Sequence, residues 1–477
     1  MCQNVYLCHF RNYVHHLYKY RYSALIILVG WATGIGIIGC KTSGSIQEVE
    51  SSNVDLDSEA GDLYALADST EDYFEDVFLR YEDHIYDDNI KTVQLHKTRF
   101  PLTAPILELN SGESIKLSFD DLGEDQVNYY YTIIHCTARW ENSELSPSDY
   151  INGFTDNQIT EYAYSFNTLT SFTHFNLDIP NEELKLTLSG NYLLKVYEED
   201  KPDEPVITKR FMVVESRVSV LPRVRKATLL NDKNYKQEVD FTIKHEGYPI
   251  FNPYGEIYVV IQQNGRWDNL VKGLAPVFVR DDELIYDYDQ DNVFNGCNEF
   301  RNFEFKSFRF QSEFIKAYDF DSAGNHVYLY SEKPRPFLRY ASHSDINGRM
   351  FIRNDEGKDS EVEADYALVH FTLPYEAPMI NGNIYVYGGL TNWEYSTVSQ
   401  LKYNYKKFAY ELTLPLKQGY YEYMYVYLED GQEGGDATLI EGSHFDTENE
   451  YTIYVYNTSS SDNYHRLIAV KKFDSRY

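Results

Sequence analysis

The sequence contains few of the residue patterns that catalytic and metal-binding sites require. It has no HExxH motif, no CxxC pair, no glycine-rich phosphate loop and no GxSxG nucleophile turn, and its 13 histidines are scattered. Asp287, Asp289 and Asp291 alternate like the start of a calcium loop, but its sixth and twelfth positions hold Asn292 and Asn298 instead of Gly and Glu. We therefore predict no enzyme active site, no cofactor and no metal.

Positive charge is also scarce. The chain has 43 Lys and Arg against 74 Asp and Glu, a formal net charge of −31. Nucleic acids and anionic lipid surfaces are poor partners for this balance, because like charges repel. A generally soluble acidic surface, or docking on a basic protein rim, fits it better.

Only five cysteines are present, and three of them lie within the first 40 residues. The other two, Cys136 and Cys297, leave two alternatives: a disulfide in an oxidising compartment, or two buried and inert thiols. Cys136 follows His135, but adjacent residues of a strand face opposite sides, so we interpret the two as a structural pair and not as a catalytic pair.

The amino-terminal segment is typical of an exported protein. Lys19 and Arg21 precede an apolar stretch from Ala24 to Ile38, which is short for a membrane span and suits a signal peptide. It ends in Ile37-Ile38-Gly39-Cys40, the pattern of a lipoprotein box in which Cys40 is acylated. The alternatives are an ordinary export signal, or a buried apolar segment that ends in cysteine.

The remaining chain predicts a tether and three all-β domains. Residues 40–72 are rich in Ser, Asp, Glu and Gly, and a segment with so few large apolar residues cannot offset its chain entropy. Beyond it, short alternating runs such as Tyr129–Ile133 and returning strands such as Val206–Val214 predict β-sandwiches. We expect a signal peptide (1–39), an acidic flexible tether (40–72) and three tandem immunoglobulin-like β-sandwiches at 73–215, 216–362 and 363–477.

A series of short sequence motifs in the first domain is similar to the pattern of a known family. In order, they are His135-Cys136, Trp140, Ser143, Leu145, Tyr150 to Phe154, Ile159, Ser165 to Thr168, Thr173-His174, Pro180-Asn181, Ser189 to Tyr192 and Arg210 to Val214. The second domain adds Asn298 to Arg301 and Phe303. This order resembles the type IX secretion system plug family of Bacteroidetes, except that Arg139 stands where the family pattern has an acidic residue.

The resemblance implies a periplasmic, non-enzymatic protein that closes the periplasmic mouth of the giant outer-membrane β-barrel translocon. A lipid on Cys40 would in addition anchor the protein to the outer membrane. The resemblance does not itself require that lipid.

The third domain has a resemblance of its own. Ile384 to Trp393, Tyr410 to Leu414 and Gln418 to Tyr425 are similar to early-set immunoglobulin-like domains of glycogen- and starch-active enzymes. This similarity implies glycan binding as the alternative function. The other interpretation is that Trp393 and these tyrosines pack the sandwich or contact a protein.

Three tryptophans are candidates for an interaction surface. They are Trp140, from the family pattern, and Trp267 and Trp393, which lie at predicted turns. Large aromatic side chains are enriched at protein interfaces, which is the basis of this expectation. We also interpret the segments at 448–451, 455–456 and 465–468 as edge strands of the third domain.

Overall fold

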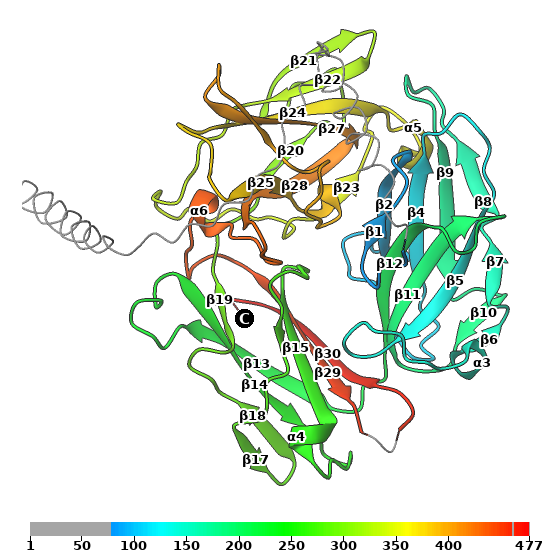
Figure 1. Cartoon of the computed structure of the whole chain (residues 1–477), viewed down its shortest axis with the longest axis vertical. Helices are drawn as coiled ribbons and strands as arrows, with labels where there is room; N and C mark the ends of the chain where they lie inside the picture. Colours follow the sequence, from blue (N-terminus) through cyan, green and yellow to red (C-terminus); the bar gives the residue numbers. More distant parts are fainter. Residues whose placement is uncertain (1–77, 460–461, 477) are drawn as a thin grey trace, which may run out of the picture. The chain divides into compact units, whose positions relative to one another are not determined.

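The computed structural model describes residues 78–459 and 462–476 (Figure 1). The predicted signal peptide, the tether and Cys40 lie outside these residues. Within the described ranges, no helix is both long enough and apolar enough to cross a membrane.

The first unit is a sandwich of two sheets. One sheet has the order β1-β12-β11-β5-β7, with β3 parallel to β12: β1 (His84–Ile85), β12 (Pro205–Val214), β11 (Gly190–Glu198), β5 (Tyr129–Cys136), β7 (Asp156–Gln158) and β3 (Ile106–Glu108). The other has the order β2-β4-β9-β8: β2 (Ile90–Lys97), β4 (Ile115–Asp121), β9 (Thr173–Ile179) and β8 (Glu161–Tyr164). A short ribbon joins β10 (Leu184–Leu186) to β6 (Ile151–Gly153).

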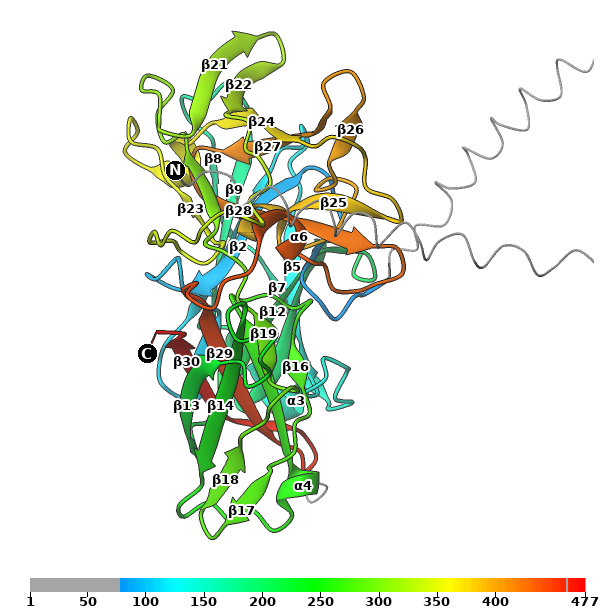
Figure 2. The same ribbon diagram turned by 90° about the vertical axis from the view of Figure 1, so that its left-hand side faces the viewer.

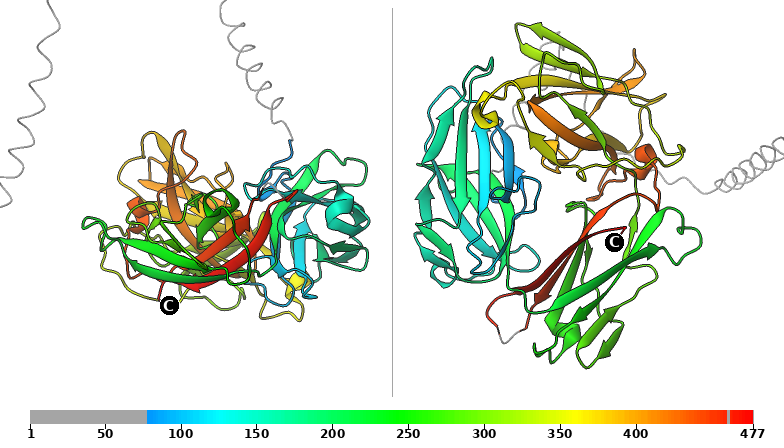
Figure 3. Two further views of the ribbon diagram at one scale, coloured as in Figure 1. Left: turned by 90° about the horizontal axis from the view of Figure 1, so that it is seen from below. Right: turned by 180° about the vertical axis from the view of Figure 1, so that it is seen from behind.

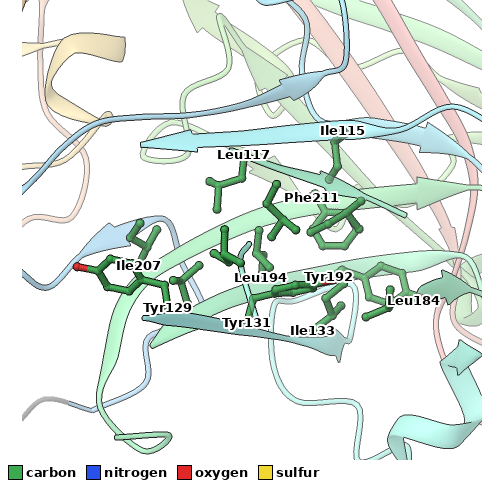
Figure 4. Close-up of a cluster of buried hydrophobic side chains, with 14 of the residues drawn as sticks. Ile115, Leu117, Tyr129, Tyr131, Ile133, Leu184, Tyr192, Leu194, Ile207 and Phe211 are labelled. Carbon is green, nitrogen blue, oxygen red and sulfur yellow. The ribbon is translucent and has the colours of Figure 1, made fainter. Parts of the chain in front are cut away.

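Alternation along the strands builds the core of this N-terminal sandwich. Tyr129, Tyr131 and Ile133 of β5 are buried while the residues between them are partly exposed, which confirms the predicted two-residue period. Figure 4 shows them facing Ile115 and Leu117 of β4 across the gap between the two sheets. The sheets are thus held together by apolar and aromatic burial.

The second unit combines strands from two distant parts of the chain. One sheet has the order β13-β14-β18-β17, with β19 paired to β14: β13 (Ser219–Lys226), β14 (Lys236–Lys244), β18 (Glu283–Tyr286), β17 (Phe278–Arg280) and β19 (Val293–Asn295). The facing sheet has the order β16-β15-β29-β30: β16 (Val271–Lys272), β15 (Ile257–Gln263), β29 (Glu450–Asn457) and β30 (Arg466–Asp474). The red β29–β30 hairpin accordingly lies along green β15 in Figures 1 and 3.

The third unit, which we term the inserted sandwich, lies between these two parts of the sequence (Figure 2). Its larger sheet has the order β21-β22-β24-β27-β26: β21 (Ile315–Asp321), β22 (Gly324–Leu329), β24 (Tyr366–Pro374), β27 (Ala409–Lys417) and β26 (Lys402–Asn404). The opposite layer pairs β28 (Gly419–Glu429) with β20 (Arg301–Glu304), β23 (Met350–Ile352) and β25 (Gly382–Tyr387).

The middle sandwich is therefore interrupted by the inserted one, which corrects the predicted boundary at 362 and 363. β20, β21 and β22 precede that boundary, yet they share one core with β24 to β28. The chain leaves and re-enters the middle sandwich at one place, since the His444 N–H donates to the Cys297 carbonyl at 2.9 Å. The edge strands predicted at 448–451 and 455–456 are wrong, because β29 is buried along its whole length between β15 and β30. The segment at 465–468 begins β30, which is the last strand of its sheet but belongs to the middle sandwich.

The prediction of an all-β fold is confirmed. Helical structure in the described residues is limited to single turns: α3 (Pro147–Tyr150), α4 (Pro253–Glu256), α5 (Ser360–Glu363), α6 (Thr438–Glu441) and the 3-10 turn η1 (Gly389–Thr391).

We expect Ile453→Ala to loosen the middle sandwich selectively. Ile453 is fully buried in β29 and packs in the core that also contains Val239 and Ile261. Removal of such a side chain costs about 2–5 kcal/mol. Hydrogen-exchange mass spectrometry should show faster exchange in β14 and β15.

The matched control is Val369→Ala in β24, which should accelerate exchange in the inserted sandwich instead. Faster exchange of β24 and β27 in the Ile453→Ala variant would contradict this assignment of β29.

Candidate functional site

The N-terminal and middle sandwiches meet at a cluster of two tryptophans and one arginine. The guanidinium of Arg210, from β12, lies 3.8 Å from the ring centroid of Trp267 and 5.5 Å from that of Trp140. The two indoles pack edge to face at 5.4 Å. Asp83 accepts hydrogen bonds from the Arg210 backbone N–H at 2.7 Å and from its guanidinium at 3.3 Å. Stacking and charge together fix this junction.

Trp393 lies at the wall of a neighbouring cavity of about 190 Å³, which Trp267 and Lys209 also line. Its indole packs against Phe300 and Tyr387, with ring centroids 6.1 and 5.4 Å apart. A Cβ at Gly348 would lie 2.5 Å from the indole, so only glycine allows this approach.

All three predicted tryptophans are partly buried against the chain itself. Trp140 and Trp393 also have left-handed backbones, with φ of 63° and 59°. Bulky residues adopt this conformation only where the surrounding packing holds them there. The aromatic residues proposed for glycan stacking behave similarly, because Tyr421, Tyr423 and Tyr425 are buried in the inserted sandwich. These positions favour the packing interpretation.

Arg139 also contributes to a junction. It lies 4.9 Å from the ring centroid of Tyr258 in the middle sandwich. The residue at which the sequence departs from the family pattern therefore makes a cation–π contact within this chain.

A buried carboxylate joins the N-terminal sandwich to the inserted one. Asp120, in β4, is fully buried and has three partners, each at 2.6 Å: the Nδ1 of His174, the hydroxyl of Tyr366 and the Nζ of Lys417. His174 belongs to the same sandwich as Asp120, whereas Tyr366 (β24) and Lys417 (β27) come from the inserted sandwich. A buried charge is tolerable only when it is paired and hydrogen-bonded in this way.

Glu361 extends this network at its solvent side. Its carboxylate lies 2.5 Å from Lys116 Nζ and 3.5 Å from His174 Nε2. The His174 and Lys116 contacts hold the pKa of Glu361 far below its ordinary value. Burial lowers the pKa of Lys417 in spite of the nearby Asp120.

Burial alone would lower the pKa of His174, but contacts with Asp120 and Glu361 outweigh burial. The pKa of His174 therefore lies above its ordinary value of 6.5.

Backbone groups reinforce the same junction. The buried carboxylate of Asp365 accepts the backbone N–H groups of Leu169 and Thr170 at 2.8 and 3.1 Å. The Phe166 N–H donates to the Val362 carbonyl at 2.9 Å. The loop after β8 is thus fixed to the inserted sandwich.

The middle and inserted sandwiches share a third polar network. Asp268 pairs with Arg266 at 2.7 Å and accepts the hydroxyls of Tyr387 and Tyr395 at 3.0 and 2.6 Å. Burial opposes ionisation of Asp268, but Arg266 and the two hydroxyls outweigh it and lower its pKa to about 2. Each pair of sandwiches is therefore connected by buried charge and aromatic contacts.

The two cysteines of the described region are buried free thiols. The structure therefore agrees with the alternative of two buried, inert thiols and contradicts the alternative of a disulfide. Burial raises the pKa of Cys136 to about 12 and that of Cys297 to about 11, so both stay protonated at neutral pH. His135, beside Cys136, has its pKa lowered to about 4 by burial and lies 3.2 Å from the Ser189 carbonyl.

Of the three alternating aspartates, Asp287 lies in an acidic group with Glu238 and Asp240. Within the described ranges, it is the one group whose ligand atoms are close enough to hold a metal. Arg225 occupies its centre, 2.6 Å from Glu238, 2.7 Å from Asp240 and 2.6 Å from Asp287. This arrangement is an ion-pair cluster with an internal cation.

Sequence reasoning missed the Asp120 network. His174 is part of one of the motifs that resemble the family. Asp120, Glu361 and Lys417 belong to no sequence motif that predicts a buried network. Asp120 and Lys417 are 297 positions apart in the sequence, and a local sequence pattern does not show which distant residues come into contact.

The fold and its junctions define a multidomain β-sandwich protein whose domains are joined through buried polar networks. The family model for the first domain of type 9 secretion system plug proteins matches residues 90–215 of this chain. A crystal structure of a hypothetical protein from Parabacteroides merdae ATCC 43184 is similar, with a TM-score of 0.81 and 33% identity over 83% of this chain and 100% of that chain. The chain belongs to the type 9 secretion system plug protein family.

The other comparisons add nothing to this assignment. The alkylpurine DNA glycosylase AlkC from Pseudomonas fluorescens covers 26% of this chain and 30% of its own at 14% identity, and its TM-score of 0.16 carries no argument. No curated protein matches the chain.

We expect Lys417→Met to destabilise the protein by about 3–5 kcal/mol, because it leaves Asp120 buried without its cation. Urea denaturation measures this loss. The matched control is Lys406→Met, at an exposed lysine of the same sandwich, which should stay within about 0.5 kcal/mol of wild type. Equal stability of the two variants would show that the buried pair does not hold the junction.

His174 should give the junction a pH dependence. Because its folded pKa is raised, its stabilising contribution is fully present below pH 6.5 and is lost as the pH rises through the folded pKa. The difference in unfolding free energy between wild type and His174→Gln should therefore shrink as the pH increases from 6 upward. A difference that is constant with pH would rule out a protonated His174 at this junction.

Proposed function

We propose that this protein is the plug of a type IX secretion system and closes the periplasmic opening of the outer-membrane translocon barrel by protein–protein contact. Family membership associates the chain with this secretion system. The structural observation that carries the proposal is the set of buried contacts that link every pair of sandwiches: the Asp120–Lys417 ion pair, the Arg210–Trp267 cation–π contact and the hydroxyls of Tyr387 and Tyr395 on Asp268.

A seal has to resist deformation, and this requirement explains why the junctions matter. Domains connected only by linkers move independently by default. Here, separation of the N-terminal and inserted sandwiches would break two of the three contacts of Asp120, those with Tyr366 and Lys417. The three sandwiches should therefore act as one rigid body, which can cover a wide opening without an active site.

The compartment and the anchor belong to the same proposal. The protein lies in the periplasm, with a lipid on Cys40 and the acidic segment 40–72 as its tether to the outer membrane. Tethering raises the effective concentration of the plug at the barrel mouth, so a modest polar interface is enough for reversible closure.

Affinity purification of the tagged protein from native outer membranes, followed by mass spectrometry, tests the proposed function. We expect a very large barrel protein in near-equal amount. Lys417→Met should lower its recovery because the body is less rigid, whereas Lys406→Met should not. Recovery of the protein alone, from intact membranes in mild detergent, would contradict a stable plug.

A further inference from the structure

The N-terminal sandwich has an open edge at β8. This strand is the last in the order β2-β4-β9-β8 and, among the described strands, pairs only with β9. All four of its residues are exposed, including the side chains of Tyr162 and Tyr164 at 44% and 61%. Exposed edges are usually blocked by lysine, proline or a bulge, and β8 (Glu-Tyr-Ala-Tyr) contains no lysine or proline and pairs with β9 without a register shift.

The backbone of β8 is oriented for the addition of another strand. The Ser165 N–H donates to Phe172 on the β9 side at 2.9 Å. Backbone groups alternate in direction along an antiparallel strand, so those of Tyr162 and Tyr164 point away from β9. The next outward N–H, that of Phe166, already donates to a separate segment at Val362.

A small slot lies beside this edge. It is a cavity of about 140 Å³ whose wall combines apolar residues such as Val127, Ile159 and Phe175 with polar ones such as Asp121, Gln126 and Asn128. A strand laid along β8 places alternate side chains on the side of this slot. Backbone pairing and a side-chain pocket are the two elements of recognition by strand addition.

The sequence that contains this edge is acidic and has no Lys or Arg. Residues 140–184 contain eight Asp and Glu but no Lys or Arg. These acids are exposed and form no ion pair within the described residues: Glu141, Glu144, Asp149, Asp156, Glu161, Asp178, Glu182 and Glu183. Glu124 and Asp125, in the loop that contributes to the slot, are exposed as well. A partner that approaches β8 therefore gains from positive charge.

We propose that β8 is a docking edge that binds an extended, Lys- or Arg-containing segment of a partner protein. The segment adds to β8 as a further strand, places an apolar side chain in the slot and faces the carboxylates with its cations. A second copy of this chain is a poor occupant, because two such edges would repel each other. The inference deepens the proposed function and rests on it only for the identity of the partner.

Calorimetric titration of the full chain with a twelve-residue peptide that alternates Val and Lys tests the docking edge. The same peptide with Glu in place of Lys should bind at least ten-fold more weakly. Tyr164→Pro removes one outward N–H at a position where an edge strand tolerates proline, and should weaken binding at least ten-fold. Tyr164→Phe keeps the N–H and should bind within two-fold of wild type.

Glu161→Lys combined with Asp125→Lys provides a second variant that leaves the backbone unchanged, and should weaken binding about ten-fold at low salt. Absence of binding, equal binding of the two peptides, or full binding by Tyr164→Pro would overturn the docking edge. If the protein self-associates and Tyr164→Pro abolishes this self-association, the edge binds a second copy of the chain, and the proposal of a basic partner segment is overturned.

The two experiments distinguish failure of the plug function from failure of the docking edge. Peptide binding at β8 without recovery of the barrel would overturn the plug function and leave the docking edge. Undiminished recovery of the barrel by Tyr164→Pro, together with absent peptide binding, would overturn the docking edge and leave the plug function.

Discussion

The buried carboxylate of Asp120 constrains the arrangement of the molecule more than any other group. It has no contact with solvent and is neutralised by Lys417 from a strand almost 300 positions away in sequence. Because Tyr366 and Lys417 come from the inserted sandwich, its separation from the N-terminal one breaks two of the three contacts of this carboxylate. The other two junctions rest on different contacts, because Arg210 and Asp268 each keep their ion-pair partner within one sandwich. Across the junctions, Arg210 stacks on Trp267, and Asp268 accepts the hydroxyls of Tyr387 and Tyr395.

These junctions also explain where the charge of the chain is used. Basic residues are scarce, and several of them, including Arg210, Arg266 and Lys417, are buried or nearly buried inside the junctions. The outer surface near β8 carries carboxylates that form no ion pair within the described residues. The basic residues thus lie at the junctions between sandwiches, and unpaired carboxylates remain on the surface near β8. Both features suit a rigid protein that docks on a basic partner.

Sequence analysis found what is local and missed what is distant. The two-residue period of β5 was predictable, because one buried sheet face imposes alternation. The strand at 206–214 was also predicted correctly, although β12 is buried on both faces. The pairing of β29 with β15 was not, since a strand pattern does not say which sheet the strand joins. Lys417 is a polar residue at a strand end, which is typical of a solvated position, and only the fold places it against Asp120. The tryptophans were candidates for an interaction surface, and each is partly buried against the chain itself.

The central claim is that the three sandwiches form one cooperative body. Differential scanning calorimetry of the chain from residue 78 onward tests it most directly, by comparing the calorimetric and van't Hoff enthalpies of unfolding. The account predicts a single transition in which the two enthalpies agree, because opening any junction exposes a buried charge network. Two or three separate transitions, each with the enthalpy of one sandwich, would contradict it.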